Sequence, residues 1–166
     1  MTHPTLLNSC ARAATAEEAR YRIQGPPTDA NAVVIALDSG AVPLLREAAA
    51  QRRSGTRFVA FTGEAAGSNG SGGASPVVTD LEQQAGPLDQ YLAGADVAVL
   101  VATSNAAGAA VVGEACRRRS TMTAAIIMGD GRDSDGAVAA LRPYARVMIV
   151  SKDPGDVGEI LSALRA

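Results

Sequence analysis

Residue types that bind anions occur at two points of this sequence, each directly after a run of apolar residues. Asp38-Ser39-Gly40 follows the run AVVIAL at residues 32–37, and the segment TSNAAG at residues 103–108 follows the run VAVLVA. Hydroxyl, amide and small side chains suit the start of a helix, where free backbone N–H groups attract a phosphate or a carboxylate. We therefore predict a ligand site formed by Asp38, Ser39, Gly40, Thr103, Ser104, Asn105 and Gly108.

The second of these segments is the better candidate for binding a phosphate. Ser104 and Asn105 supply hydrogen-bond donors, and the following Ala106, Ala107 and Gly108 leave the N–H groups of a helix start uncovered. Such a site needs no basic side chain. The alternative interpretation is a capped helix start without a ligand, because every strand–helix connection of this kind contains one.

The first segment carries an acid where a dinucleotide site would carry glycines. The Rossmann dinucleotide motif reads G-x-G-x-x-G, and here Gly40 alone matches it. Asp38 would repel a phosphate unless a metal ion lay between them. Three interpretations stay open: an ordinary NAD site, a cap for the next helix formed by Asp38 or Ser39, and a ligand pocket lined by Asp38.

Several other chemistries lack the residues that they need. His3 is the sole histidine and lies near the terminus, so a Ser-His-Asp triad has no suitable base. The sequence contains neither a Cys/His cluster for zinc nor the GK[ST] of a Walker loop. The segment DGRDSDG at residues 130–136 fails the calcium-loop pattern, because Gly131 and Arg142 stand where acids are required. We interpret it as a polar turn with a helix cap, and we predict neither a metal ligand nor a catalytic residue.

The composition excludes further classes of protein. The net charge is −2 and aromatic residues make up 3% of the chain, which disfavours both the basic surface and the stacking platform of a nucleic-acid-binding protein. No apolar run reaches the roughly 18 residues of a membrane span. Cys10 and Cys116 form no disulfide framework, a usage that suits a reducing cytoplasm. We expect a cytoplasmic protein without nucleic-acid or membrane partners, and we expect Cys116 to pack in the core.

Strands and helices that would position the two turns alternate along the chain. Continuous apolar runs predict strands at residues 32–37, 57–62, 97–102, 124–128 and 146–150, with a short edge strand at 77–80. Helical patterns predict helices at residues 42–53, 87–93, 106–118, 137–142 and 153–164. This alternation predicts an α/β fold, a three-layer, doubly wound, Rossmann-like and mostly parallel sheet of five or six strands. In such a sheet the two turns would emerge side by side on one edge.

Two segments stand apart from this alternation. Residues 1–30 are predicted to form an N-terminal helical extension, a packing or oligomer element, preceding an α/β domain at residues 31–166. Residues 63–76 (GEAAGSNGSGGASP) contain five Gly and three Ser, a composition typical of flexible loops. Two interpretations of this loop stay open, a lid over the ligand site and a segment without a chemical role.

Between about residues 32 and 164 the chain resembles the nucleotide-binding half of the FtsZ/tubulin family. VVIALDSGAVPLLREA corresponds to that family's first strand and first glycine-rich loop, and RFVAFT corresponds to its second strand. Gly94-Ala95-Asp96 precedes the strand that leads to the signature loop. That loop reads GGGTGTG in the family, where it cradles the nucleotide phosphates, and SNAAGAA here, at residues 104–110. The resemblance implies GTP or another nucleotide as ligand, bound without the complete GTPase motifs.

The same layout is similar to that of sugar-isomerase (SIS) domains. In those domains a Ser/Thr-rich turn after a strand holds a sugar phosphate, as Thr103, Ser104 and Asn105 would here. Three functions follow from these patterns: a binding module for a nucleotide or phosphorylated metabolite, a non-catalytic interaction or assembly subunit with a degenerate nucleotide fold, and a subunit of a phosphosugar or other metabolite enzyme. Each is expected to work as a homo-oligomer or beside a partner subunit.

Overall fold

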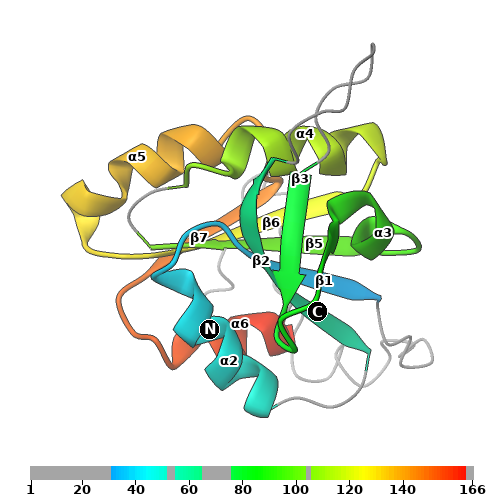
Figure 1. Ribbon diagram of the computed structural model, residues 1–166. Coiled ribbons are helices and arrows are strands. Elements are labelled where there is room, and N and C mark those ends of the chain that lie inside the picture. The colour runs from blue at the N-terminus through cyan, green and yellow to red at the C-terminus, as the bar shows by residue number, and fades with distance from the viewer. Residues whose placement is uncertain (1–30, 52–54, 65–75, 104–105, 164–166) are drawn as a thin grey trace, which may run out of the picture.

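The computed structural model describes residues 31–51, 55–64, 76–103 and 106–163 (Figure 1). The predicted extension at residues 1–30 lies outside the described residues, as do residues 65–75 of the glycine-rich loop. Ser104 and Asn105 of the predicted ligand site also lie outside them. Among the described residues, no helix combines the length and the apolar character needed to cross a bilayer.

In the described part of the chain, seven strands form one sheet in the order β4-β3-β2-β1-β5-β6-β7. Five of them, β1, β2, β5, β6 and β7, run parallel, whereas β3 and β4 form an antiparallel hairpin next to β2. The predicted α/β fold with a mostly parallel sheet is confirmed. The strands are β1 (Ala32–Ala36), β2 (Thr56–Glu64), β3 (Pro76–Asp80), β4 (Ala85–Pro87), β5 (Val97–Ala102), β6 (Met122–Met128) and β7 (Val147–Ser151).

Two predictions about the strands were wrong. The sheet has more than the five or six strands expected, because β4 consists of the three residues Ala-Gly-Pro. These residues have low strand propensity and no apolar alternation, so nothing in their sequence indicates a strand. The segment at residues 77–80 is also not an edge strand, since β3 pairs with β2 on one side and with β4 on the other.

Helices follow most of the parallel strands. They are α2 (Ala41–Ala50), α3 (Leu88–Leu92), α4 (Ala109–Arg118), α5 (Gly131–Leu141) and α6 (Asp156–Ala163). The interpretation of DGRDSDG as a polar turn was wrong, because α5 already begins at Gly131. Ser134, Ala137 and Leu141 are buried at positions i, i+3 and i+7, which is the spacing of a helix face. The polar Ser134 hid the first member of this stripe from a pattern search based on apolar residues.

Helices cover both faces of the sheet, and two hydrophobic cores fill the space between. Val33, Ile35 and Leu37 face the core beneath α3, α4 and α5, whereas Val34 and Ala36 face the core beneath α2 and α6. Figure 1 shows α4 and α5 on one side of the sheet and α2 and α6 on the other. Because both of their faces are covered, β1 and β5 are buried at every position. This burial explains their uninterrupted apolar sequences.

Candidate functional site

The direction in which the chain adds strands reverses between β1 and β5. From β1 the chain continues through α2 to β2 on one side, whereas β5 lies on the other side of β1 and continues through α4 to β6. The two helices pack on opposite faces of the sheet. In open α/β sheets, the crevice at the carboxyl ends of strands flanking such a point is where ligands bind.

The turns that follow β1 and β5 lie side by side at this edge of the sheet. The strands are in register, with Ala36 opposite Val101, and the N–H of Leu37 donates to the carbonyl of Val101 at 2.9 Å. Asp38 and Thr103 stand two residues after Ala36 and Val101, respectively. The structure thus brings Asp38, Ser39, Gly40 and Thr103 together, with Gly108 at the far end of the second turn.

The Asp38 carboxylate joins the two turns. Its Oδ1 accepts the N–H of Ala41, the first residue of α2, at 2.9 Å and the Thr103 hydroxyl at 2.8 Å. Its Oδ2 accepts the N–H of Thr103 at 2.8 Å. These contacts fit the helix-cap interpretation of Asp38, because the negative charge lies at the positive end of the α2 dipole. The same contacts direct the carboxylate toward Thr103 rather than toward solvent.

The Thr103 side chain lies so close to Gly40 that it leaves no room for a Cβ atom there. A Cβ atom added to Gly40 would lie 2.4 Å from Thr103 Oγ1 and 3.2 Å from Thr103 Cβ. No larger residue fits without moving the hydroxyl that donates to Asp38. Ser39 lies between Asp38 and Gly40 and is exposed to solvent. Glycine is therefore required here for the close approach of two turns, whether or not a ligand binds.

Gly108 has a comparable neighbour, which the sequence alone did not reveal. A Cβ atom on Gly108 would lie 2.5 Å from Cδ1 of Phe61, a half-buried residue in the last part of β2. The Phe61 ring therefore lies against the turn that precedes α4. The sequence offered one signal for it, since the whole chain has two Phe residues and this one ends the run RFVAF.

Gly129 and Ser134 extend the candidate site toward β6 and also escaped the sequence prediction. A Cβ atom on Gly129 would lie 3.4 Å from the carbonyl oxygen of Thr103 and 3.5 Å from Cβ of the buried Ser134. The turns after β1, β5 and β6 therefore pack in a row with Thr103 at the centre. Glycines border Thr103 on both sides, so its surroundings are formed largely by backbone.

Beyond the central turns, the polar and charged side chains at this edge of the sheet bond to neighbouring residues. Lys152 forms an ion pair with Asp130, the hydroxyl of Ser151 donates to Asp156, and Asp153 Oδ1 accepts the N–H of Gly155 at 2.9 Å. Neither turn of the candidate site contains a basic residue. An anion held there would depend on backbone N–H groups and on hydroxyl or amide donors.

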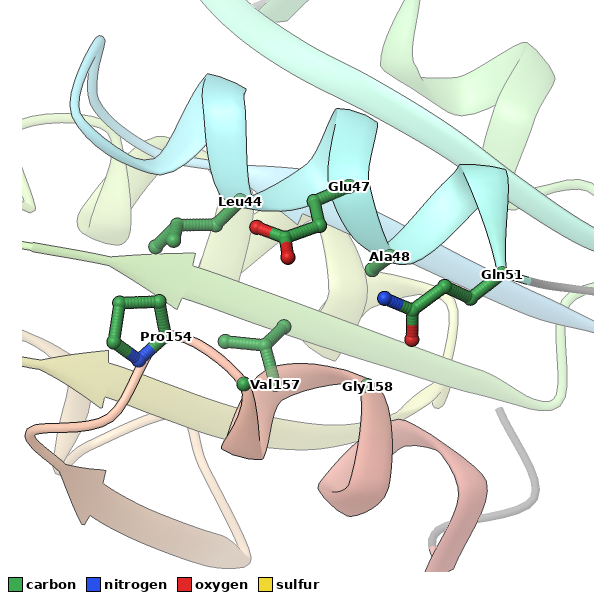
Figure 2. Close-up of a pocket in the computed structure, with 8 residues that line it drawn as sticks. Leu44, Glu47, Ala48, Gln51, Pro154, Val157 and Gly158 are labelled. Atoms are coloured by element: carbon green, nitrogen blue, oxygen red, sulfur yellow. The ribbon is translucent and has the colours of Figure 1, made fainter.

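A separate shallow groove lies between α2 and the segment that leads into α6. It encloses about 200 Å³, including its open mouth, and Figure 2 shows Glu47 of α2 and Gln51, which caps that helix, lining it opposite Pro154 and Val157. Gly158 lets the two helices approach, because a Cβ atom there would lie 3.3 Å from Gln51 Oε1. None of the predicted site residues lines this groove.

The buried position of Cys116 makes its thiol unreactive. Cys116 of α4 is buried, and its burial raises the pKa of the thiol to about 11, which keeps it protonated and unreactive. The prediction that Cys116 packs in the core is confirmed. On the exposed side of the same helix, the hydrogen bond from Arg117 lowers the pKa of the Glu114 carboxyl. No three His, Cys, Asp or Glu side chains in this part of the chain are grouped to hold a metal ion.

The protein thus has an α/β fold with a mostly parallel sheet, and the direction in which the chain adds strands reverses between β1 and β5. The chain matches no protein-family model, and no curated protein is similar to it in sequence. The resemblance to FtsZ and SIS domains therefore stays a prediction from the sequence.

Proposed function

We propose that this protein is a binding module for a nucleotide or phosphorylated metabolite, built on a three-layer, doubly wound, Rossmann-like fold. One observation carries the proposal: Asp38 and Thr103, which begin the turns after β1 and β5, adjoin at the point where these strands send their helices to opposite faces. This is the position at which sheets of this kind bind ligands.

In this proposal the anionic group of the ligand lies against the first turn of α4. Small residues, Ala106, Ala107 and Gly108, precede that helix, and Ala107 is exposed to solvent. Ser104 and Asn105 add donors to the backbone N–H groups. Asp38 does not contact the ligand but holds Thr103 in place, while Ser39 and Gly40 form the neighbouring wall.

The ligand class follows from the same residues. Without a basic side chain in either turn, the site suits a phosphate that is part of a larger molecule, such as GTP or another nucleotide, whose remaining atoms supply further contacts. The module binds in the cytoplasm and lacks complete GTPase motifs, so we assign it no catalytic residue. A homo-oligomer or a partner subunit is compatible with binding at this edge.

Calorimetry with GTP, ATP, NAD, glucose 6-phosphate and inorganic phosphate tests this function. One phosphorylated compound is expected to bind and to raise the melting temperature, since ligand at 100 times its dissociation constant adds about 2.7 kcal/mol to the free energy of unfolding. No heat from any compound at millimolar concentration, together with an unchanged melting temperature, would reject the function.

A charge variant locates the binding within the fold. Ala107→Asp places a carboxylate at the start of α4, where the helix dipole tolerates or favours it, so the protein should fold normally. The same charge would repel a bound phosphate and weaken binding roughly tenfold to a hundredfold. Ala107→Asn has nearly the same shape without the charge and should bind as the unmodified protein does. Equal weakening by both variants would show that bulk, rather than anion binding, matters here.

A further inference from the structure

The exposed large apolar side chains in the described part of the chain all lie on β6 and β7. They are Met122, Val147 and Val150, which are 44%, 44% and 49% exposed. The register pairs Ala124 with Val147, so Met122 and Val147 lie on the same face of the sheet. Val150, three residues after Val147, lies on the other face. β7 is therefore exposed on both faces, and no described strand pairs with its outer edge.

The two edges of the sheet differ in how well they are protected against pairing. β4, at one edge, has three residues and ends in Pro87, which cannot donate a hydrogen bond. β7, at the other edge, has five residues, Val-Met-Ile-Val-Ser, without a proline or a charge. Natural sheets usually shield an edge with proline, charges or short length, and β7 has none of these protections within its bounds.

Charges flank β7 unequally. Arg142, in the cap of α5, and Arg146, directly before β7, are both exposed and form no ion pair with any described residue. At the other end of the strand, Lys152 is paired with Asp130. The amino end of β7 is thus positively charged, and none of the described residues forms an ion pair with these charges.

These charges disfavour a second copy of the chain as the occupant of this edge. An antiparallel two-fold arrangement that pairs all five residues of β7 places Ile149 opposite itself, and it therefore places Arg146 opposite Lys152. Lys152 is cationic and is already paired with Asp130, so a second copy offers Arg146 no unpaired acid at this position. A partner with acidic residues at these positions would instead be attracted.

We propose that β7 is a docking site for an extended segment of another protein, which adds to the sheet as an eighth strand. The segment carries branched apolar residues that cover Val147 and Val150 and an acidic residue beside Arg142 and Arg146. Main-chain hydrogen bonds to the open edge supply the affinity, and alternate side chains supply the specificity. This edge is formed by a different strand from those that carry the two ligand-site turns, because β6 lies between β7 and β5.

A pair of designed peptides tests the docking site. The probe is acetyl-Glu-Val-Val-Thr-Val-Val-Glu-amide, which carries valine on both faces, with alternate residues N-methylated so that one edge cannot pair and the peptide stays monomeric. Its control replaces both Glu with Lys. In an NMR titration of the labelled protein, the acidic peptide is expected to shift the amide signals of residues 146–152 and to bind at least about fivefold more tightly than the lysine peptide.

Reversing the charges at Arg142 and Arg146 should reverse which of the two peptides binds more tightly. Arg142→Glu/Arg146→Glu alters two exposed side chains, and it is expected to favour the lysine peptide over the acidic one. Val150→Lys should weaken both peptides. Equal binding of the two peptides to the unmodified protein, shifts confined to other strands, or no binding at millimolar peptide would overturn the proposal. So would a dimer in light scattering that Val150→Lys dissociates, since a second copy would then be the occupant.

Discussion

Among single residues, Asp38 makes the contacts on which the arrangement of the candidate site depends. It accepts hydrogen bonds from Ala41 and from both the N–H and the hydroxyl of Thr103, so it connects the start of α2 with the turn after β5. Hydrogen bonds to a charged acceptor contribute more than those between neutral groups. The half-buried carboxylate therefore has a structural role in holding the two turns together, whether or not a ligand binds nearby.

Replacement of Asp38 should destabilise the whole domain. Asp38→Ala removes the acceptor for Ala41 and for two donors of Thr103, and we expect a loss of roughly 2–4 kcal/mol in the free energy of unfolding. Urea denaturation measures this loss. Ser39→Ala, at the exposed neighbouring position, is the control and should change the free energy by less than about 0.5 kcal/mol. Equal stability of the two variants would contradict the structural role of Asp38.

The buried thiol of Cys116 predicts a loss of stability at high pH. Burial raises its pKa from 9.0 to about 11, so the unfolded chain releases the thiol proton at a lower pH than the folded chain does. The contribution is complete below pH 9 and is lost as the pH rises through 11, with a total of roughly 2–3 kcal/mol.

Comparison with Cys116→Ala isolates this contribution from the titration of other groups. The difference in unfolding free energy between the two proteins, measured in urea at pH 8 and at pH 11, should shrink at the higher pH. A difference that is the same at both pH values would mean that the thiol is not protected by burial.

At the scale of the elements, the sequence was informative where burial is complete and uninformative where tertiary contacts decide. The run VAVLVA predicted the bounds of β5 because both of its faces are covered by helices. The same reasoning failed for β4, whose Ala-Gly-Pro sequence forms a strand through its pairing with β3. It failed again for the first turns of α5, where the burial of Ser134 outweighs the turn propensity of DGRDSDG.

The candidate site likewise contains some residues that the sequence predicted and others that it did not. The strand order places Asp38 and Thr103 together, and the alternation of strands and helices in the sequence was sufficient to predict that proximity. Phe61 and Gly129 could not be predicted, because they reach the site from strands whose positions in the sheet depend on the complete topology. The sequence also gave no reason to expect that Gly40 accommodates a hydroxyl group.

The surroundings of Gly108 and Gly136 predict opposite effects when each is replaced by alanine. Gly108→Ala would place Cβ 2.5 Å from the Phe61 ring, and we expect it to cost about 1–3 kcal/mol of stability. Gly136→Ala, in α5, meets no atom within 4 Å and should stabilise the protein by roughly 0.5–1 kcal/mol, because alanine favours a helix. Thermal and urea denaturation measure both changes.

A second substitution separates steric conflict from a backbone effect at Gly108. Phe61→Leu shortens the side chain that the new Cβ atom meets, so the cost of Gly108→Ala should be smaller in that background. If Gly108→Ala costs the same with Phe61 and with leucine at that position, the ring is not the obstacle.

On the scale of the whole molecule, two regions of the sheet have different surface properties. The carboxyl ends of β1 and β5 present closely packed turns with backbone groups and no basic side chain, whereas the outer edge of β7 presents apolar side chains and arginines. Their separation allows a small ligand and a protein partner to bind at the same time. The proposed ligand site is the part of this description on which the function depends.

An NMR titration with inorganic phosphate, the group shared by all the proposed ligands, tests that site most directly. The account predicts that the amide signals of Gly40, Thr103 and Ala107 shift together with increasing phosphate, and that Ala107→Asp abolishes these shifts. Unchanged signals at these positions up to tens of millimolar phosphate, or shifts confined to the groove between α2 and α6, would contradict it.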